Sequence, residues 1–425
     1  MKKNNLLIKN AAELVTCSGN KAKHGEEMKN IHTIKNGAVV IEGGIIKAVN
    51  TTEEILKIYN EEDYEVIDAS NKCVLPGFVD SHTHFIFGGY RADEFAWRLR
   101  GDSYMDIMER GGGIQNTVTS TRNASEEELY NVGFKRLNDM LKLGVTTVEG
   151  KSGYGLDFDT EIKQLKVMKN LNENHAMDLA ITFLGAHSVP PEYKGKNNEY
   201  IDFIIKKVLP VVKSENLAEF CDVFCEDKVF SVDESRKLLL KAKEMGFKLK
   251  LHADEIVTLG GSELAAEVGA ISADHLLHAS DDGIKAMAEK KVISTLLPCT
   301  AFCLKEPYAR AREMIDSGCA VALASDFNPG SCFTYSIPLV FAVAAIYMNM
   351  SIEEAITALT INGAAAIGRS ASIGSIDPGK NGDIVILKYP SYNFIPYNTG
   401  INLVETVIKN GNVVVNVRSE ERRVG

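Results

Sequence analysis

The middle of the chain constrains the fold more than any other feature. Between about residues 74 and 370, short β-branched runs alternate with longer helical patterns, which predicts a parallel sheet covered by helices. The expected strands end near His84, Glu149, His187, Glu226, His252, His275, Leu297 and Asp326. Most of these ends are about 20–40 residues apart, as strand–helix units require, so a closed (β/α)8 barrel of the TIM type is predicted. An open doubly wound sheet is the alternative, but no glycine-rich nucleotide fingerprint or Walker lysine motif supports it.

Both ends of the chain carry strand signals of another kind. The hairpin and strand signals are Asn36-Gly37, Gly43-Gly44, residues 384–387 and Asn410-Gly411. Because these signals flank the barrel segment on both sides, we expect the two ends to pair. The sequence therefore predicts a small β-sandwich domain from residues 1–73 and 374–425, beside a barrel of residues 74–373.

Composition excludes several classes of partner. The net charge is −10 and the pI about 5.5, whereas nucleic acids and anionic membranes require a basic field. No run approaches the ~20 apolar residues of a membrane span, and the start of the chain does not resemble a signal peptide. The chain has eight cysteines, which we expect to be free thiols in a reducing cytoplasm.

Histidines and one aspartate at the expected strand ends suggest a metal site. His82 and His84 follow the apolar run 75–80, and residues two apart on a strand point to the same side. A His-x-His pair is often two unrelated histidines, but here an apolar strand runs into a polar end. His252 and Asp326 end two further strands. Three imidazoles with one carboxylate form a ligand set typical of zinc or iron.

Two further residues near these ends are candidates for acid–base chemistry. Glu255, three residues after His252, can carry a proton between a metal-bound water and a leaving nitrogen, although a solvated loop position suits it equally. His275 is a candidate for polarising the substrate or deprotonating water. Asp326 has an alternative role as the N-cap of the next helix, but an acid ending an apolar run is costly unless paired or metal-bound.

Several segments together resemble a known family. Residues 76–84, Pro-Gly-Phe-Val-Asp-Ser-His-Thr-His, are similar to the first-strand motif of the amidohydrolase superfamily. The closer resemblance is carried by residues 82–95, 111–114, 151–157, 183–187, 252–255 and 325–331. In combination these segments resemble the imidazolonepropionase family over nearly the whole chain.

This resemblance implies a function and a set of site residues. The expected reaction is hydrolysis of the small anion 4-imidazolone-5-propanoate to N-formimidoyl-L-glutamate in histidine degradation. The implied metal ligands, for one zinc or iron ion (Fe2+ or Fe3+) per subunit, are His82, His84, His252 and Asp326. The implied catalytic groups are Glu255, His275 and Asp326. The implied substrate contacts are Arg91, Tyr154, His187, Glu255, Asn328, Gly330 and Ser331. The family is cytoplasmic and commonly dimeric.

The number of metals and the type of substrate also follow from this comparison. Many superfamily members hold two metals bridged by a modified lysine at the fourth strand. The expected fourth strand, residues 221–226, has no lysine at its end, and the role of Lys151 after the second strand stays open. We therefore expect one metal. Arg91 can bind a carboxylate bidentately, which would let an acidic protein bind an anion.

Three alternatives stay open. A nucleobase deaminase of the guanine or cytosine class would share the metal ligands and release ammonia. A non-catalytic scaffold on the same barrel would bind no transition metal. The apolar run 337–350 suits either a buried helix or a dimer face.

Overall fold

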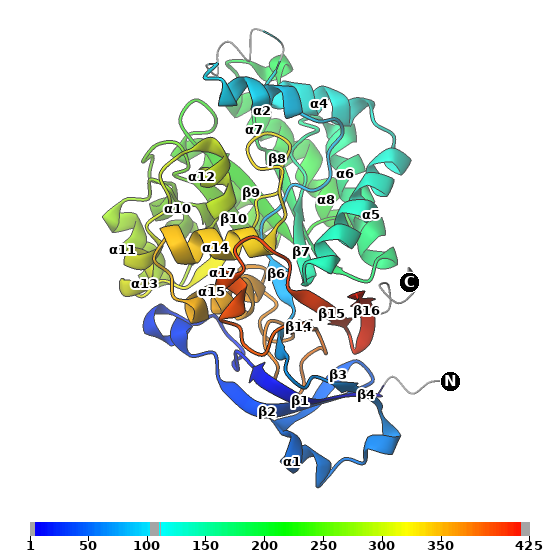
Figure 1. Cartoon of the computed structure of the whole chain (residues 1–425). Coiled ribbons are helices and arrows are strands. Elements are labelled where there is room, and N and C mark those ends of the chain that lie inside the picture. The colour runs from blue at the N-terminus through cyan, green and yellow to red at the C-terminus, as the bar shows by residue number, and fades with distance from the viewer. Residues whose placement is uncertain (1–4, 103–109, 111, 418–425) are drawn as a thin grey trace.

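The structure, a computed structural model, describes residues 5–102, 110 and 112–417, and its larger unit is a closed barrel (Figure 1). Eight parallel strands pair in chain order from β6 to β13. They are β6 (Phe78–Asp80), β7 (Val145–Lys151), β8 (Asp178–Ala186), β9 (Phe220–Cys225), β10 (Lys248–Ala253), β11 (Ser272–His275), β12 (Ile293–Leu296) and β13 (Val321–Leu323). The Asp326 amide donates to the His82 carbonyl (3.0 Å) and the His84 amide to the Phe327 carbonyl (2.9 Å), which closes the ring. The predicted (β/α)8 fold is confirmed.

The expected strand ends lie close to the observed ones. β11 ends at His275 as predicted, and His187 lies directly after β8. The largest offsets occur at the short strands β6 and β13, which end before His84 and Asp326. The backbone of Asp326 has a φ of +50°, a left-handed conformation that interrupts an extended strand. The sequence pattern therefore predicts all eight barrel strands, and the differences concern only the residue at which a strand ends.

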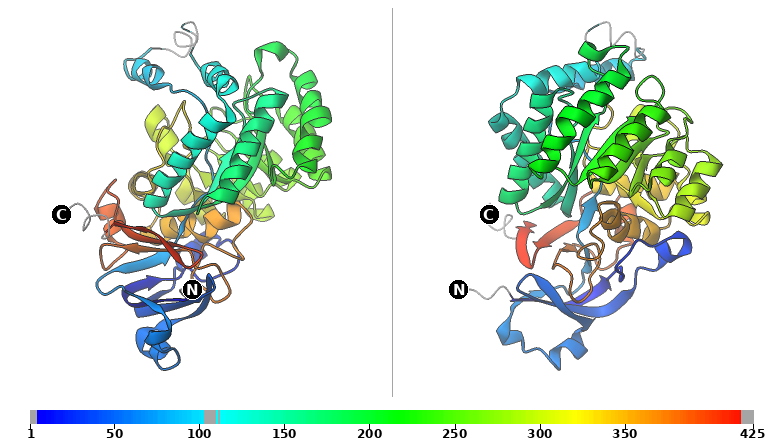
Figure 2. Two further views of the ribbon diagram at one scale, coloured as in Figure 1. Left: turned by 90° about the vertical axis from the view of Figure 1, so that its right-hand side faces the viewer. Right: turned by 180° about the vertical axis from the view of Figure 1, so that it is seen from behind.

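Helices cover the outside of the barrel (Figure 2). The helices that follow α2 (Ala92–Leu99) include α4 (Ile114–Asn123), α5 (Glu126–Lys142), α6 (Phe158–Asn174), α7 (Asn197–Phe203), α8 (Leu209–Ser214), α9 (Val232–Glu244), α10 (Gly261–Val268), α11 (Asp281–Lys290), α12 (Pro298–Leu304), α13 (Ala311–Asp316), α14 (Ile337–Tyr347), α15 (Ile352–Leu359) and α16 (Ile361–Ala366). Capping boxes at Ser125 and Ser231 start α5 and α9 by satisfying free backbone amides. α2 and α4 lie at the far end of the barrel from the terminal sheet described next.

The two ends of the chain form one composite β-unit, here called the terminal sheet. Its strands are β1 (Asn5–Val15), β2 (Thr33–Glu42), β3 (Ile45–Thr51), β4 (Glu65–Asp68), β5 (Cys73–Pro76), β14 (Ile384–Leu387), β15 (Val404–Lys409) and β16 (Asn412–Asn416). β1 is irregular at Asn10 (φ +61°), pairing with β4 before it and β5 after it. Ile8, Val39, Ile386 and Ile408, from both parts of the sheet, share one apolar cluster. The expected pairing of the two chain ends around a common core is confirmed.

Two of the three hairpin predictions are confirmed and one is wrong. Gly43-Gly44 joins β2 to β3, and Asn410-Gly411, with both φ values positive, joins β15 to β16. Asn36-Gly37 instead lies inside β2. A two-residue type I′ turn needs positive φ at both residues, and here only Asn36 has it (+49°). Both sides of this segment pair with neighbouring strands, which holds it extended.

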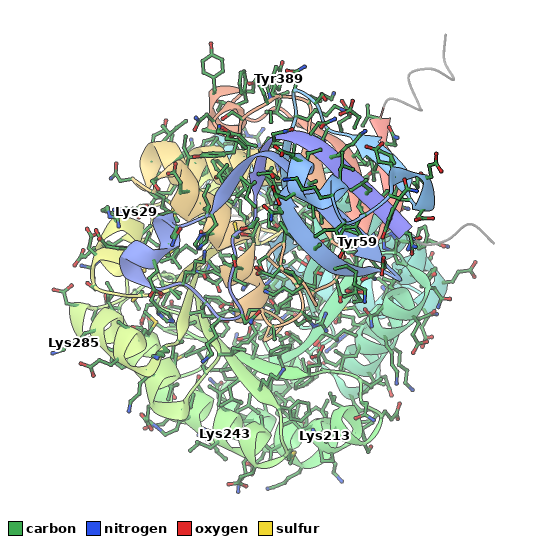
Figure 3. The ribbon with its side chains drawn as sticks, turned by 90° about the horizontal axis from the view of Figure 1, so that it is seen from below. Lys29, Tyr59, Lys213, Lys243, Lys285 and Tyr389 are labelled. Atoms are coloured by element: carbon green, nitrogen blue, oxygen red, sulfur yellow. The ribbon has the colours of Figure 1, made fainter. Side chains whose placement is uncertain are left out.

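Helix α14, within the apolar run 337–350, is mainly a buried helix. Val340, Phe341 and Ala344 are fully buried, while Ile346 and Tyr347 near its end are exposed. Around the rim, surface lysines such as Lys213, Lys243 and Lys285 point outward (Figure 3). All eight cysteines are free thiols, as expected. Among the described residues, no helix is both long and apolar enough to cross a membrane.

Candidate active site

The predicted metal ligands meet at the carboxyl ends of the barrel strands. His82 and His84 follow β6, and His252 lies within β10. Asp326 follows β13, and its left-handed backbone turns the chain sharply at that point. All four side chains are buried. Three segments distant in sequence therefore place three imidazoles and one carboxylate in one cluster.

The distances between ligand atoms fit one small cation. Nε2 of His82 and Nε2 of His84 lie 3.5 and 3.6 Å from Oδ1 of Asp326. Nε2 of His252 lies 3.4 Å from Nε2 of His84. Bonds of about 2.0–2.2 Å in a tetrahedral array place neighbouring ligand atoms about 3.3–3.6 Å apart. Nε2 of His82 is buried without a hydrogen-bond partner among the described residues, a costly state that a cation would relieve.

Two carboxylates lie beside the Nδ1 atoms of the His82 and His252 imidazoles. Nδ1 of His82 lies 2.7 Å from Oδ2 of Asp274. Nδ1 of His252 lies 3.1 Å from Oδ2 of Asp222, within ion-pair distance but outside hydrogen-bond geometry, and the backbone amide of His252 donates to Oδ1 of Asp222. A carboxylate at Nδ1 favours the tautomer that carries its proton there, which frees Nε2 for a metal. Asp222 and Asp274 were not among the residues predicted from the sequence.

Burial controls the charge of the ligand cluster. Burial, reinforced by neighbouring positive charges, lowers the pKa of His82 and His84 well below the usual value. Both imidazoles are therefore neutral near pH 7, the form that binds metals. Burial raises the pKa of Asp326 to about 6, so its carboxylate is mostly ionised at neutral pH. The Thr300 hydroxyl donates to Oδ2 of Asp326 (2.6 Å), while Oδ1 faces the imidazoles.

Five ionisable side chains, here called the charged layer, lie on the Nδ1 side of the imidazoles of His82 and His252. They are Glu149, Lys151, Asp222, Lys250 and Asp274, and each is 0% exposed. Nζ of Lys151 lies 2.7 Å from Asp222 and 3.0 Å from Glu149. It also lies 3.5 Å from Asp274. Nζ of Lys250 lies 3.4 Å from Glu149 and 3.7 Å from Asp274. The layer thus joins both imidazole-orienting carboxylates through shared ammonium groups.

The contacts of Lys151 within the charged layer indicate its role. Burial alone would lower the pKa of Lys151, but the carboxylates of Asp222, Glu149 and Asp274 outweigh this effect and raise it. The raised pKa favours the ammonium form over the free amine from which a carbamate is made, and Nζ lies within ion-pair distance of three carboxylates, so Lys151 is an ion-pair partner in this structure. The fourth barrel strand, β9, contains no lysine.

A cavity of about 240 Å3 opens in front of the ligands. The predicted site residues in its wall are His84, Arg91, Tyr154, His187, His252, Glu255, His275, Asp326, Asn328, Gly330 and Ser331. His82 lies deeper, against Asp326. The wall also includes Arg98, Ile114, Phe224 and Ile256, which the sequence analysis did not identify. Gly111, within one of the resembling segments, lies outside the described residues.

Glu255 and His275 form a pair suited to proton transfer. Oε2 of Glu255 lies 3.5 Å from Nε2 of His275. Burial and the nearby Asp326 raise the pKa of Glu255 well above its usual value. Burial and His252 lower the pKa of His275 well below its usual value. These shifts favour the protonated carboxyl group of Glu255, which can donate, and the neutral imidazole of His275, which can accept.

Short contacts also fix two other side chains of the cavity wall, Arg91 and His187. Nε of Arg91 donates to Glu94 (2.8 Å), which also accepts from the Gly113 amide (3.0 Å). His187 Nδ1 lies 3.1 Å from the Gly153 carbonyl oxygen, and its ring stacks on that of His84 with centroids 5.0 Å apart. These contacts hold a cation and an aromatic group at fixed positions in the wall.

The loop after β13 is held by one amide side chain. Oδ1 of Asn328 accepts from the amides of Gly330 (2.9 Å) and Ser331 (2.8 Å). Its Nδ2 donates to the Asp326 carbonyl (2.8 Å). Asn328 therefore couples the shape of this loop to the position of a metal ligand.

The barrel and its buried ligand cluster define a class. The chain belongs to the Amidohydrolase family, whose sequence profile matches residues 73–414. A solved adenosine deaminase from Xanthomonas campestris with bound zinc has a TM-score of 0.68 and 16% identity, covering 97% of this chain and 93% of that one. That likeness concerns the fold alone.

Relatives with higher sequence identity identify the family within this class. The imidazolonepropionase of Clostridium tetani (strain Massachusetts / E88) is 69% identical, covering 97% of this chain and 99% of the relative. The imidazolonepropionase of Parabacteroides distasonis is 60% identical, covering 97% of this chain and 99% of the relative. Within the amidohydrolases, the chain belongs to the imidazolonepropionase family.

Proposed function

We propose that this chain hydrolyses the ring C–N bond of 4-imidazolone-5-propanoate to give N-formimidoyl-L-glutamate, a step of histidine degradation. The observation that carries the proposal is the buried cluster of His82, His84, His252 and Asp326 in a member of the imidazolonepropionase family. The substrate is a small anion, which matches the guanidinium of Arg91 in the cavity wall.

One Zn2+ or Fe2+/Fe3+ ion per subunit would be held by these four residues. Neutral imidazoles with one carboxylate suit zinc or iron, whereas Ca2+ and Mg2+ need more oxygen ligands. When bound, the ion lowers the pKa of water and polarises a carbonyl group. Asp274 and Asp222 keep Nε2 of His82 and His252 directed at the ion.

The acid–base steps belong to three side chains. His275 or Asp326 accepts a proton from water as the water oxygen bonds to the ring carbonyl carbon. Glu255 donates a proton to the ring nitrogen as the C–N bond breaks. The proximity of Glu255 and His275, and the raised pKa of Glu255, support these roles.

Substrate binding uses the remaining wall of the cavity. Arg91 binds the propanoate carboxylate, because guanidinium and carboxylate groups match in charge and shape. Tyr154 and His187 flank the ring, and Glu255 contacts its nitrogen. The remaining contacts come from the loop residues Asn328, Gly330 and Ser331.

The test is turnover of freshly made 4-imidazolone-5-propanoate, with and without a chelator. We expect N-formimidoyl-L-glutamate to form, activity to fall after metal removal, and zinc or iron to restore it. Ammonia release from guanine or cytosine without imidazolone turnover would favour the deaminase alternative. Absence of both turnover and bound transition metal would favour the scaffold. Glu255→Gln should lower kcat about 10²–10⁴-fold with metal retained, and an unchanged kcat would refute its role.

We also propose a cytoplasmic homodimer. The free thiols support a reducing compartment. The exposed Ile346 and Tyr347, with Tyr347 stacked on Tyr308, offer an apolar contact surface. Light scattering after gel filtration should give twice the chain mass, and a monomer at micromolar concentration would contradict this.

We further propose that the chain divides into residues 1–73 with 374–425 and residues 74–373. The terminal sheet has an apolar cluster of its own, which supports this division. Hydrogen exchange should show the two units opening with different free energies, and a single common opening would contradict it.

A further inference from the structure

A second guanidinium reaches the cavity beside Arg91. Arg98 lies in α2, seven residues after Arg91, which precedes the first residue of that helix. Seven residues are close to two helical turns, so the two side chains leave the helix on one face. Both line the cavity that also contains His84 and Glu255.

Arg98 has hydrogen-bonding capacity that the described residues do not use. Its Nη2 donates to the Gly330 carbonyl (3.3 Å). Its Nη1 is buried and has no hydrogen-bond partner among the residues that the structure describes. Leaving a buried charged donor unpaired is costly. Nη1 of Arg91 also approaches Gly330, since a Cβ added there would lie 2.3 Å from it. The two guanidinium groups therefore converge on the same loop.

The charges of the two arginines are compensated unequally. Arg91 pairs with Glu94 at 2.8 Å, whereas among the described residues Arg98 has no ion-pair partner and is attracted to Glu94 only at longer range. Burial lowers the pKa of Arg98, and the positive charge of Arg91 lowers it further. Counted by themselves, the two arginines and Glu94 sum to one positive charge on this side of the cavity. A bound monoanion would neutralise it.

We propose that Arg98 is a specificity-determining residue that binds the substrate carboxylate together with Arg91. This inference rests on the proposed function, which supplies an anionic substrate. Nε of Arg91 donates to Glu94, which leaves its two Nη groups for the substrate, and the unpartnered Nη1 of Arg98 adds a further donor beside them. The propanoate chain then points toward α2, and the ring points toward the metal ligands and Glu255.

The first test is the kinetics of Arg98→Met. Loss of a charge-assisted contact should raise KM about 10- to 100-fold. kcat should stay within about twofold, because the carboxylate is held equally before and during reaction. Arg98→Lys keeps the charge without the fork and should give an intermediate KM. Arg100→Met, at the exposed end of the same helix, is the matched control and should keep the KM of the unaltered protein.

A second measurement separates charge recognition from general damage. Imidazole-4-propanoate and its carboxamide are stable probes that differ in one charge. The unaltered protein should bind the acid more tightly, and Arg98→Met should lose most of that preference. An unchanged KM, or equal weakening for acid and amide, would overturn the role of Arg98. If Arg98→Met melts early, Arg98→Lys decides by the same comparison. Failure of the unaltered, metal-loaded protein to turn over substrate would instead count against the proposed function.

Discussion

Replacing Lys151 with methionine should destabilise the metal-free protein more than the metal-loaded protein. The charged layer and Asp326 together hold four carboxylates and two ammonium groups. The site thus carries a net charge of −2, which a divalent cation neutralises. Lys151→Met keeps the approximate length of the side chain but removes one positive charge. The net charge of the site then becomes −3 without metal and −1 with a divalent cation bound.

The expected size follows from the burial of these groups. Removing one partner of a buried ion pair costs about 3–5 kcal/mol, because a charge is left uncompensated. An unfolding entropy of about 2.1 cal/mol/K per residue gives about 0.9 kcal/mol/K for 425 residues. The melting temperature of the metal-free variant should therefore fall by about 3–6 °C. The loaded variant should fall by less, so metal should raise the melting temperature more in the variant than in the unaltered protein.

The assay is thermal unfolding of both proteins with and without zinc, followed by circular dichroism. Lys380→Met is the matched control, because Lys380 is also buried but donates to the backbone carbonyls of Gly19 and Ser370 and is not part of the charged layer. That variant should lose the same stability in both metal states. Equal losses in both states for Lys151→Met, or no loss at all, would refute the charge argument.

Three further substitutions test the site. His252→Ala should abolish stoichiometric metal binding and turnover, as measured by metal analysis of the purified protein; full retention of metal would remove His252 from the ligand set. Asp222→Asn should weaken metal affinity about 10–100-fold in chelator competition, since it no longer orients His252; unchanged affinity would contradict that role. Gly330→Ala should raise KM by displacing Arg91, which its Cβ would meet at 2.3 Å. Its melting temperature should stay unchanged because that contact is the flexible end of a side chain, and an unchanged KM would argue against Arg91 as the carboxylate ligand.

Regular local patterns explain why so much of the fold could be predicted. The eight barrel strands and helices such as α5 and α9 have clear periodicity and capping signals. The turn predicted at Asn36-Gly37 was wrong because a dipeptide reports only a local turn preference. The strands β1 and β3 pair with β2 on both sides and hold this segment extended. Arg98 was missed for a similar reason. An arginine in an amphipathic helix usually faces solvent, and only the docking of α2 over the barrel brings it to the cavity.

The charged layer was missed although the sequence carried a signal for it. Residues two apart on a strand share a face, which is why His82 was predicted to lie beside His84. On two other barrel strands, Glu149 shares a face with Lys151, and Lys250 shares a face with His252. A charged residue that shares a face with a metal ligand must point into the barrel, where it is costly unless an opposite charge meets it. Strands carrying lysine and strands carrying acid inside one closed barrel therefore imply ion pairs behind the metal. Which acid meets which lysine depends on strand register, and the sequence does not contain that information locally.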